Sequence, residues 1–239
     1  MSVTTRIQPG ASLRSERGEA VHVGPWRGEG SYARVYRATL ADTGCGCALK
    51  IAKPEIANAS QWLQEERRVL ESVQHPHLVK LLGAGSTEVS PFLLLEWLEG
   101  EALHDLVRAR RRLPLRQALE ILDALAAATA AIHSRGIAHG DIRSQNVLIV
   151  AQRGAVLIDP GPGEPLALDE RPAQRDLRCL GDLLHLMLTG SLPTPHHAML
   201  TAANGFSRPV VELWGRTQLP EPPAASELHQ QLSQLRKSL

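Results

Sequence analysis

The sequence predicts an α+β chain in two parts: a small antiparallel sheet that carries one helix, then a larger and mainly helical part. Residues 21–97 contain short apolar runs separated by glycine and polar turns, which is typical of strands. Residues 98–239 instead contain long stretches with the 3.6-residue periodicity of amphipathic helices. At 239 residues the chain can bury a core in each part. Residues 1–20 form a polar leader that we expect to be partly disordered.

The first part is predicted to contain several short strands and one helix. Residues 21–36 alternate between apolar and polar and are interrupted by GEGS, which indicates two strands joined by a flexible hairpin. Cys47–Ile51 reads as a third strand, and two later strands are predicted at LVKLLGAG and PFLLLEWL. Apolar residues recur at helical spacing over residues 59–73, which predicts one amphipathic helix.

The second part is predicted to be built around one long helix. Leu115, Leu119, Leu122 and Ile132 follow helical spacing, and the pattern stops near Gly136. Two short strands are predicted at NVLIV and AVLID, on either side of the turn AQRG. Three further helices are predicted over residues 173–189, 209–217 and 226–238.

Composition and charge exclude several classes of partner. Lys and Arg number 26 against 25 Asp and Glu, a net charge of +1, so we expect no nucleic-acid partner. The three cysteines are too few and too irregularly spaced for a disulfide framework, which favours a reducing, cytoplasmic setting. The N-terminal residues lack the apolar core of a signal peptide, and the most apolar stretch, residues 118–132, still contains Glu120 and Asp123. We therefore expect no signal peptide and no membrane anchor. Cys45 and Cys47 could suggest a metal site, but two thiols in a hairpin without further ligands are more typical of a turn.

One polar run contains the strongest candidates for functional residues. HGDIRSQN places Asp141 and Asn146 five positions apart, immediately before the apolar run VLIV. This spacing suits a loop that holds a metal ion and a hydroxyl group. The chain has few lysines, so Lys50, within the apolar strand CALKI, is a second candidate for a functional role.

Several motifs, in this order, resemble those of the protein kinase superfamily, and specifically a minimal eukaryotic-like (Hanks-type) protein kinase with a shortened activation segment. GEGSYARVY resembles the glycine-rich loop, CALK the lysine strand, LLLEWLEGEAL the hinge, HGDIRSQN the catalytic loop and IDPG the metal-binding motif. EERRVLESVQHPHLVKLLG is similar to the main helix of the small lobe, which puts Glu66 at the ion-pair position. DLRCLGDLLHLMLTG resembles the buried helix that anchors the catalytic loop, here through Asp176. The resemblance implies one kinase domain over residues 21–239, with an N-lobe at 21–97 and a C-lobe at 98–239.

The resemblance also implies transfer of the γ-phosphate of ATP, with magnesium or manganese, to a Ser or Thr hydroxyl of a protein substrate. The implied catalytic residues are Asp141 as general base, Arg143 as a donor to the transferred phosphate, and Lys50 paired with Glu66. The implied metal ligands are Asn146 and Asp159. The implied nucleotide-binding residues are Gly28, Gly30, Ser31, Val35, Ala48, Lys50, Leu95, Glu96, Trp97 and Leu148.

The sequence departs from the family in its regulatory segment. Gly140 replaces the arginine that usually precedes the catalytic aspartate, and Asp159 lies only 17 positions before Asp176 (176 minus 159). RPAQ is the nearest approach to the APE motif, and Pro222 stands where its arginine partner is expected, so both members of that ion pair are predicted to be lost. Pro160 should stiffen the segment. We therefore expect no control by activation-loop phosphorylation.

Two alternatives to a protein kinase follow from the same motifs. The first is a small-molecule phosphotransferase, which HGD in place of HRD favours. The second is a pseudokinase, which binds nucleotide as a scaffold without transferring phosphate. The complete glycine-rich loop and the full set of charged site residues favour an active protein kinase over both. The sequence leaves open the protein substrate, the preference for Ser/Thr over Tyr, the oligomeric state, and whether the chain is a signalling kinase or an effector delivered into another cell.

Overall fold

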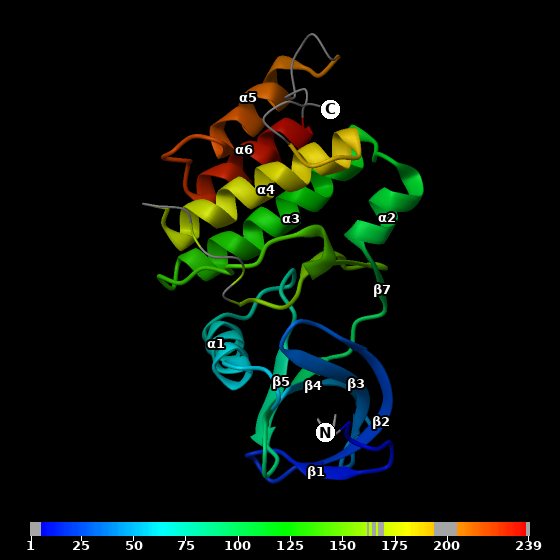
Figure 1. Cartoon of the computed structure of the whole chain (residues 1–239). Coiled ribbons are helices and arrows are strands. Elements are labelled where there is room, and N and C mark those ends of the chain that lie inside the picture. The colour runs from blue at the N-terminus through cyan, green and yellow to red at the C-terminus, as the bar shows by residue number, and fades with distance from the viewer. Residues whose placement is uncertain (1–5, 162, 164–165, 167–169, 194–204, 238–239) are drawn as a thin grey trace. The chain divides into compact units, whose positions relative to one another are not determined.

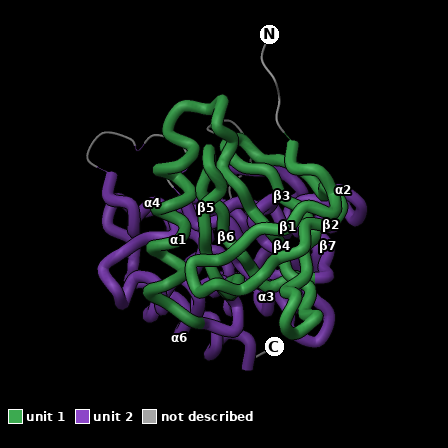
Figure 2. The backbone as a smooth tube through the Cα atoms, turned by 90° about the horizontal axis from the view of Figure 1, so that it is seen from below, with its two compact units in different colours: residues 1–74, 79–98 green, residues 75–78, 99–239 purple. Residues whose placement is uncertain are grey.

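The computed structural model describes residues 6–161, 163, 166, 170–193 and 205–237. The chain divides into two compact units, one made of residues 1–74 and 79–98 and the other of residues 75–78 and 99–239 (Figures 1 and 2). The short segment 75–78 belongs to the second unit although it lies within the sequence of the first.

Unit 1 contains a six-stranded antiparallel sheet with the order β1-β2-β3-β4-β6-β5 (Figure 1). Its strands are β1 Ser12–Arg14, β2 Ala20–Glu29, β3 Ala33–Leu40, β4 Gly46–Ala52, β5 Leu81–Ser86 and β6 Pro91–Glu96. Tyr36, Leu49, Phe92 and Leu94 are buried within it and form its core. The strand β1 was not predicted, because it lies in the leader and is specified by its pairing of Leu13 with Val21 rather than by an apolar pattern of its own.

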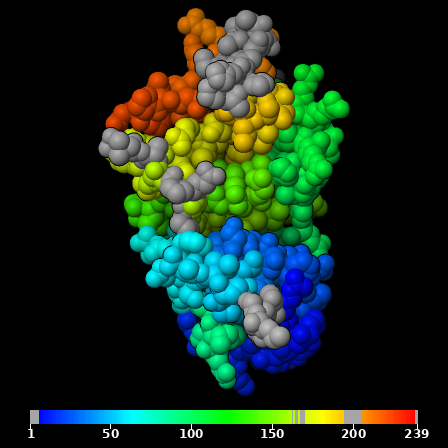
Figure 3. All heavy atoms as spheres, in the orientation of Figure 1, coloured from blue at the N-terminus to red at the C-terminus, as the bar shows by residue number. Residues whose placement is uncertain are grey.

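The helix α1, Ala59–Ser72, confirms the prediction for residues 59–73. Leu63, Glu66, Val69 and Leu70 are buried on one side of this helix. The opposite side, which carries glutamine, glutamate and arginine, is exposed (Figure 3, cyan). Glu66 is therefore a charged residue on an otherwise apolar face, which requires a buried partner.

Unit 2 is mainly helical and contains a small sheet with the order β7-β8-β9. Its elements are β7 Gly100–Ala102, α2 Leu103–Arg110, α3 Leu115–His133, the 3-10 turn η1 Ser144–Asn146, β8 Val147–Val150, β9 Gly154–Leu157, α4 Pro172–Thr189, α5 Arg208–Thr217 and α6 Ala225–Lys237. The predicted helices and strands are confirmed to within two residues or so. The short strand β7 lies in the stretch that was assigned only to the hinge, and the helix α2, which begins at the last residue of that stretch, was not predicted.

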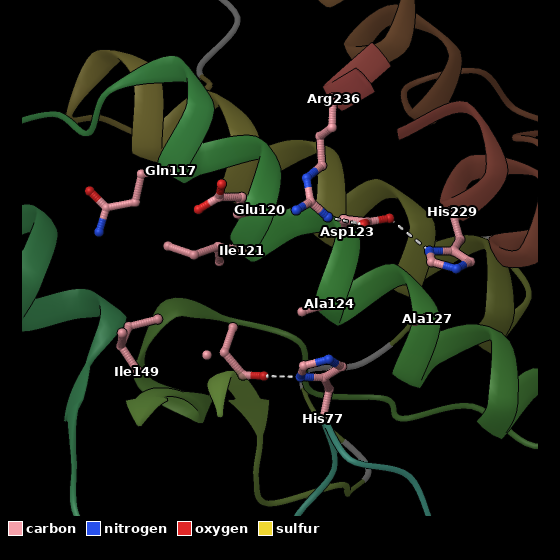
Figure 4. Close-up of a pocket in the computed structure, with 12 residues that line it drawn as sticks. His77, Gln117, Glu120, Ile121, Asp123, Ala124, Ala127, Ile149, His229 and Arg236 are labelled. Carbon is pink, nitrogen blue, oxygen red and sulfur yellow. Dashed lines mark hydrogen bonds and ion pairs between the residues drawn. The ribbon is translucent and has the colours of Figure 1, made fainter. Parts of the chain in front are cut away.

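The long helix α3 packs against α4 and α6 and forms the centre of unit 2 (Figure 1). Its apolar residues Leu119, Leu122, Leu125 and Ile132 are almost completely buried. The carboxylate of Asp123 attaches α6 to this helix. It bonds to the His229 ring at 2.7 Å and to the Arg236 guanidinium (Figure 4), and the Ser233 hydroxyl donates to it over 3.2 Å. Asp123, His229 and Arg236 border a cavity of about 340 Å³ whose lining includes none of the predicted site residues.

The cysteines are free thiols, and Cys47 is buried in β4. Burial raises the pKa of Cys47 to about 11 and that of Cys179 to about 12, so both thiols are protonated and unreactive at neutral pH. Among the described residues no cluster of three metal-ligating side chains is present. In the same part of the chain, no helix is both long and apolar enough to cross a bilayer.

Candidate active site

A buried ion pair lies in unit 1. Nζ of Lys50, on β4, is 2.6 Å from Oε2 of Glu66, on α1. The two side chains are only 5% and 0% exposed, so each charge is almost entirely removed from water. The pair confirms the position that the sequence assigned to Glu66. Because an unpaired buried charge costs several kcal/mol, about 3–5, each partner requires the other.

Three of the predicted nucleotide-binding residues share one face of the sheet with Lys50. Val35 lies directly opposite Lys50 across β3 and β4, and Ala48 lies opposite Leu95 across β4 and β6. Lys50 and Ala48 are two residues apart on one strand, and residues opposite each other in an antiparallel pair project to the same side. The face therefore presents three small or apolar side chains beside one ammonium group.

The glycine-rich loop includes the end of β2, which carries Gly28, and the turn from β2 to β3, which carries Gly30 and Ser31. A Cβ added at Gly28 or Gly30 would meet no atom within 4 Å, so neither glycine is needed for packing within the loop. What glycine provides here is open backbone that a ligand can approach closely. Lys53 fixes the loop, since its Nζ donates to the Gly30 carbonyl over 2.7 Å.

The predicted hinge residues lie at the end of β6. The backbone N–H of Lys80 donates to the Glu96 carboxylate over 2.8 Å, and the Glu96 N–H donates to the Lys80 carbonyl over 2.9 Å. The ring of Trp97 is covered by guanidinium groups, with Arg37 at 4.3 Å and Arg27 at 5.5 Å from its centre. These cation–π contacts give the Trp97 ring a packing role in unit 1.

The catalytic-loop residues are brought together in unit 2. The amide nitrogen of Asn146 donates to the backbone carbonyl of Asp141 over 2.9 Å and to its Oδ2 over 2.8 Å. Nε of Arg143 lies 3.3 Å from the same carboxylate oxygen. Because the Asn146 nitrogen is used by Asp141, the amide carbonyl oxygen is the atom that could bind a metal.

Asp176, on α4, anchors the start of this loop through hydrogen bonds from the loop backbone. Its carboxylate, 1% exposed, accepts the backbone N–H groups of His139 at 2.8 Å and Gly140 at 2.9 Å. The ring Nε2 of His133 lies 2.8 Å from the same carboxylate. The predicted anchoring role of Asp176 is thus confirmed. Burial lowers the pKa of His139, so its imidazole is neutral at neutral pH.

The segment after β9 runs beside the catalytic loop. The N–H of Ile158 donates to the Asn146 carbonyl and that of Gly161 to the His139 carbonyl, both over 2.9 Å. These bonds place Asp159, which has a left-handed φ of 56°, directly after a residue bonded to Asn146. Residues 162, 164–165 and 167–169 of the segment predicted to be stiff lie outside the described residues.

Leu148, the last nucleotide-binding candidate, lies on β8 between Ala102 and Val156.

The close approach of Gly161 to the catalytic loop also explains the glycine at position 140. This residue has a φ of +84°, and a Cβ at its position would collide with the carbonyl oxygen of Gly161. Both its backbone conformation and the close approach of another main chain require glycine. The departure from arginine is therefore a local packing requirement of this loop.

Substituting Gly140→Ala is expected to destabilise the fold by about 2–3 kcal/mol, because it adds a backbone collision to the strain of a positive φ. Gly136→Ala is the matched control: φ is +71°, but a Cβ there would meet nothing within 4 Å, so only the strain of about 1 kcal/mol applies. Urea unfolding of both variants measures the difference. Equal losses of stability would show that Gly161 does not approach Gly140 closely.

The RPAQ segment takes part in an ion pair that was not predicted. Arg171, just before α4, lies 3.3 Å from Glu221, beside Pro222. The two segments that usually share a glutamate–arginine pair are therefore joined by a pair with the charges exchanged. Its side chains are 68% and 84% exposed, so its contribution to stability is small.

Sequence reasoning missed one residue of the site. The hydroxyl of Tyr32, at the tip of the glycine-rich loop, bonds to both Lys50 and Glu66. One of only two tyrosines in the chain, within a turn of small residues, was the available signal. Its partners lie 18 and 34 positions away, so no local pattern connects them.

The two-lobed α+β fold, the buried lysine–glutamate pair and the anchored aspartate loop define a protein kinase domain. Comparison with known families agrees, since the protein kinase domain matches residues 22–177, more than half of the chain. The chain belongs to the protein kinase family, whose members use ATP and magnesium.

Curated relatives include serine/threonine kinases from distant organisms. The chain is 33% identical over 125 residues to the serine/threonine-protein kinase pkn2 of Myxococcus xanthus, an alignment that covers 51% of this chain and 15% of the relative. It is 33% identical over 146 residues to the 3-phosphoinositide-dependent protein kinase 1 of Arabidopsis thaliana, covering 58% and 29%. It is 31% identical over 132 residues to the serine/threonine-protein kinase CG17528 of Drosophila melanogaster, covering 54% and 18%. The chain thus spans less than a third of the length of these relatives.

Proposed function

We propose that this chain is a protein kinase domain that transfers the γ-phosphate of ATP to a Ser or Thr hydroxyl of a protein substrate in the cytoplasm. We assign residues 21–239 to this single domain, with residues 21–97 as its N-lobe and 98–239 as its C-lobe. The observation that carries the proposal is the buried Lys50–Glu66 pair, because two desolvated charges are costly and a site that binds the phosphates of ATP gives them a use. The serine/threonine kinases among the relatives support the choice of acceptor.

The proposed roles follow from the chemistry of each side chain. Lys50, held by Glu66, binds the phosphates of ATP, and the open backbone at Gly28 and Gly30 contacts them. Asp141 orients the substrate hydroxyl and accepts its proton as the oxygen bonds to the γ-phosphorus and the bond to the β–γ bridging oxygen breaks. Arg143 donates to the transferred phosphate.

Asn146 and Asp159 are the proposed ligands of a magnesium ion. The two residues offer an amide carbonyl oxygen and a carboxylate, the hard donors that this ion prefers, and the bond from Ile158 to Asn146 keeps them close in the chain's fold. Bound there, the ion would neutralise phosphate charge. The chain's own contribution is to hold the amide oxygen of Asn146 and the carboxylate of Asp159 in place for the ion.

The proposed kinase needs no phosphate on its activation segment. Gly140 provides no guanidinium for such a phosphate, and the collision with Gly161 leaves no room for an arginine side chain in this arrangement. The same contact weakens the argument for a small-molecule phosphotransferase. Glycine at this position is explained by packing and carries no information about the acceptor.

The test is transfer of labelled γ-phosphate from ATP and magnesium to protein substrates and to a panel of metabolites. Wild-type protein is expected to label protein hydroxyls. At ATP concentrations well below KM, Lys50→Met is expected to lose on the order of 10²-fold in rate, because the phosphates lose their positive partner. Phosphatase treatment is expected to leave the wild-type rate unchanged. Labelling of a metabolite alone would favour a small-molecule phosphotransferase, and ATP binding without any transfer would favour a scaffold.

A further inference from the structure

Tyr32 connects the glycine-rich loop to two other elements of unit 1. Its hydroxyl donates to Oε2 of Glu66 over 2.9 Å and accepts from Nζ of Lys50 over 3.2 Å. Nζ of Lys50 also lies 5.0 Å from the centre of the tyrosine ring. The ring meets Trp62 of α1 edge-on, with the ring centres 5.7 Å apart. One side chain of the loop therefore contacts both β4 and α1.

We propose that Tyr32 is a positioning residue: its hydroxyl holds Lys50 and Glu66 in register and fastens the glycine-rich loop to them before nucleotide binds. This inference deepens the proposed function and rests on it. Tyr32 acts through Lys50, the residue that binds phosphate.

Burial of the ion pair gives the hydroxyl its importance. Lys50 and Glu66 are 5% and 0% exposed, and a desolvated ion pair is stable only when further hydrogen bonds replace the lost water. A phenol can donate and accept at once, so it serves the carboxylate and the ammonium together. Hydrogen bonds to charged groups are about twice as strong as those between neutral groups.

The backbone around Tyr32 is fixed as well, so the side chain does not hang from a free loop. The N–H of Lys53 donates to the Tyr32 carbonyl over 2.8 Å, and Nζ of Lys53 donates to the neighbouring Gly30 carbonyl over 2.7 Å. The N–H of Gly30 closes the turn on Ala33 over 2.9 Å. These bonds restrain the backbone from which the Tyr32 side chain reaches the ion pair.

Tyr32→Phe tests the hydroxyl while keeping the ring contact with Trp62. Without nucleotide, hydrogen exchange of the amides of residues 28–33 is expected to accelerate about tenfold, because a hydrogen bond to charged groups is lost. In transfer assays the KM for ATP is expected to rise about threefold to tenfold with kcat nearly unchanged, because Lys50 binds phosphate in the ground state and the transition state alike. If Tyr32 had a merely structural role, Tyr32→Phe would lower stability without raising KM at an unchanged kcat.

Tyr36→Phe is the matched control. Tyr36 is 1% exposed in the same sheet, and its buried hydroxyl has no hydrogen-bond partner among the residues that the structure describes. Its removal is expected to change neither exchange nor KM. Wild-type exchange and KM in Tyr32→Phe, or a lower KM, would overturn the proposal. If wild-type protein transferred no phosphate, the proposed function would fail separately, and exchange and calorimetric ATP affinity would still decide the role of Tyr32.

Discussion

Asp141→Asn is expected to lower the rate of phosphoryl transfer by about 10²- to 10⁴-fold, because an amide cannot accept the proton of the substrate hydroxyl. The substitution preserves shape, and its carbonyl oxygen can still accept the hydrogen bond from Asn146, now 2.8 Å long. The loop should therefore keep its fold while losing its base. Single-turnover transfer of labelled phosphate at saturating ATP measures the chemical step directly.

Asp105→Asn provides the control for this loss. Asp105 is an exposed acid on α2 in the same unit, and removing its charge is expected to leave transfer at the wild-type rate. Circular dichroism and unfolding midpoints confirm that both variants remain folded. Retention of more than about a tenth of the wild-type rate in Asp141→Asn would exclude Asp141 as the base.

The parts of the fold that the sequence predicts well are those with a long local pattern. The helices α1 and α3 carry several turns of periodic apolar residues, so their ends could be placed within a residue or two. The strand β1 and the helix α2 are short and carry no such pattern. Each is stabilised by its neighbours, β1 by pairing with Val21 of β2 and α2 by packing against β7 and η1.

The same distinction applies to the site. Lys50, Glu66 and Asp176 could be assigned because each lies in a motif whose spacing is fixed by one strand, one helix or one loop. The exchanged Arg171–Glu221 pair and the contacts of Tyr32 join residues far apart in the chain. Gly140 was recognised as a departure, but its reason, the approach of the Gly161 carbonyl, exists only in the folded chain.

Asp176→Asn is expected to destabilise unit 2 by about 2–3 kcal/mol, a loss comparable to leaving a buried backbone donor unpaired. The Asp176 carboxylate uses both oxygens, Oδ2 for the N–H of His139 and Oδ1 for that of Gly140. An asparagine has only one carbonyl oxygen, so its NH₂ group would face one of these N–H groups donor to donor. Because the two N–H groups belong to the catalytic loop, the destabilisation should appear locally as faster hydrogen exchange at residues 139 and 140.

Asp182→Asn, two turns further along α4, is the matched substitution. Burial raises the pKa of Asp182, so at neutral pH its charged form is disfavoured in the folded state, and an amide removes that cost. Its Oδ1 accepts a hydrogen bond from the Gln218 side chain over 3.3 Å, a bond that asparagine can keep. Urea unfolding at neutral pH is therefore expected to show a large loss for Asp176→Asn and little or no loss for Asp182→Asn. Similar values for the two variants would mean that the catalytic loop does not depend on the two oxygens of Asp176, and that the loop's own bonds between Asp141 and Asn146 suffice to hold it.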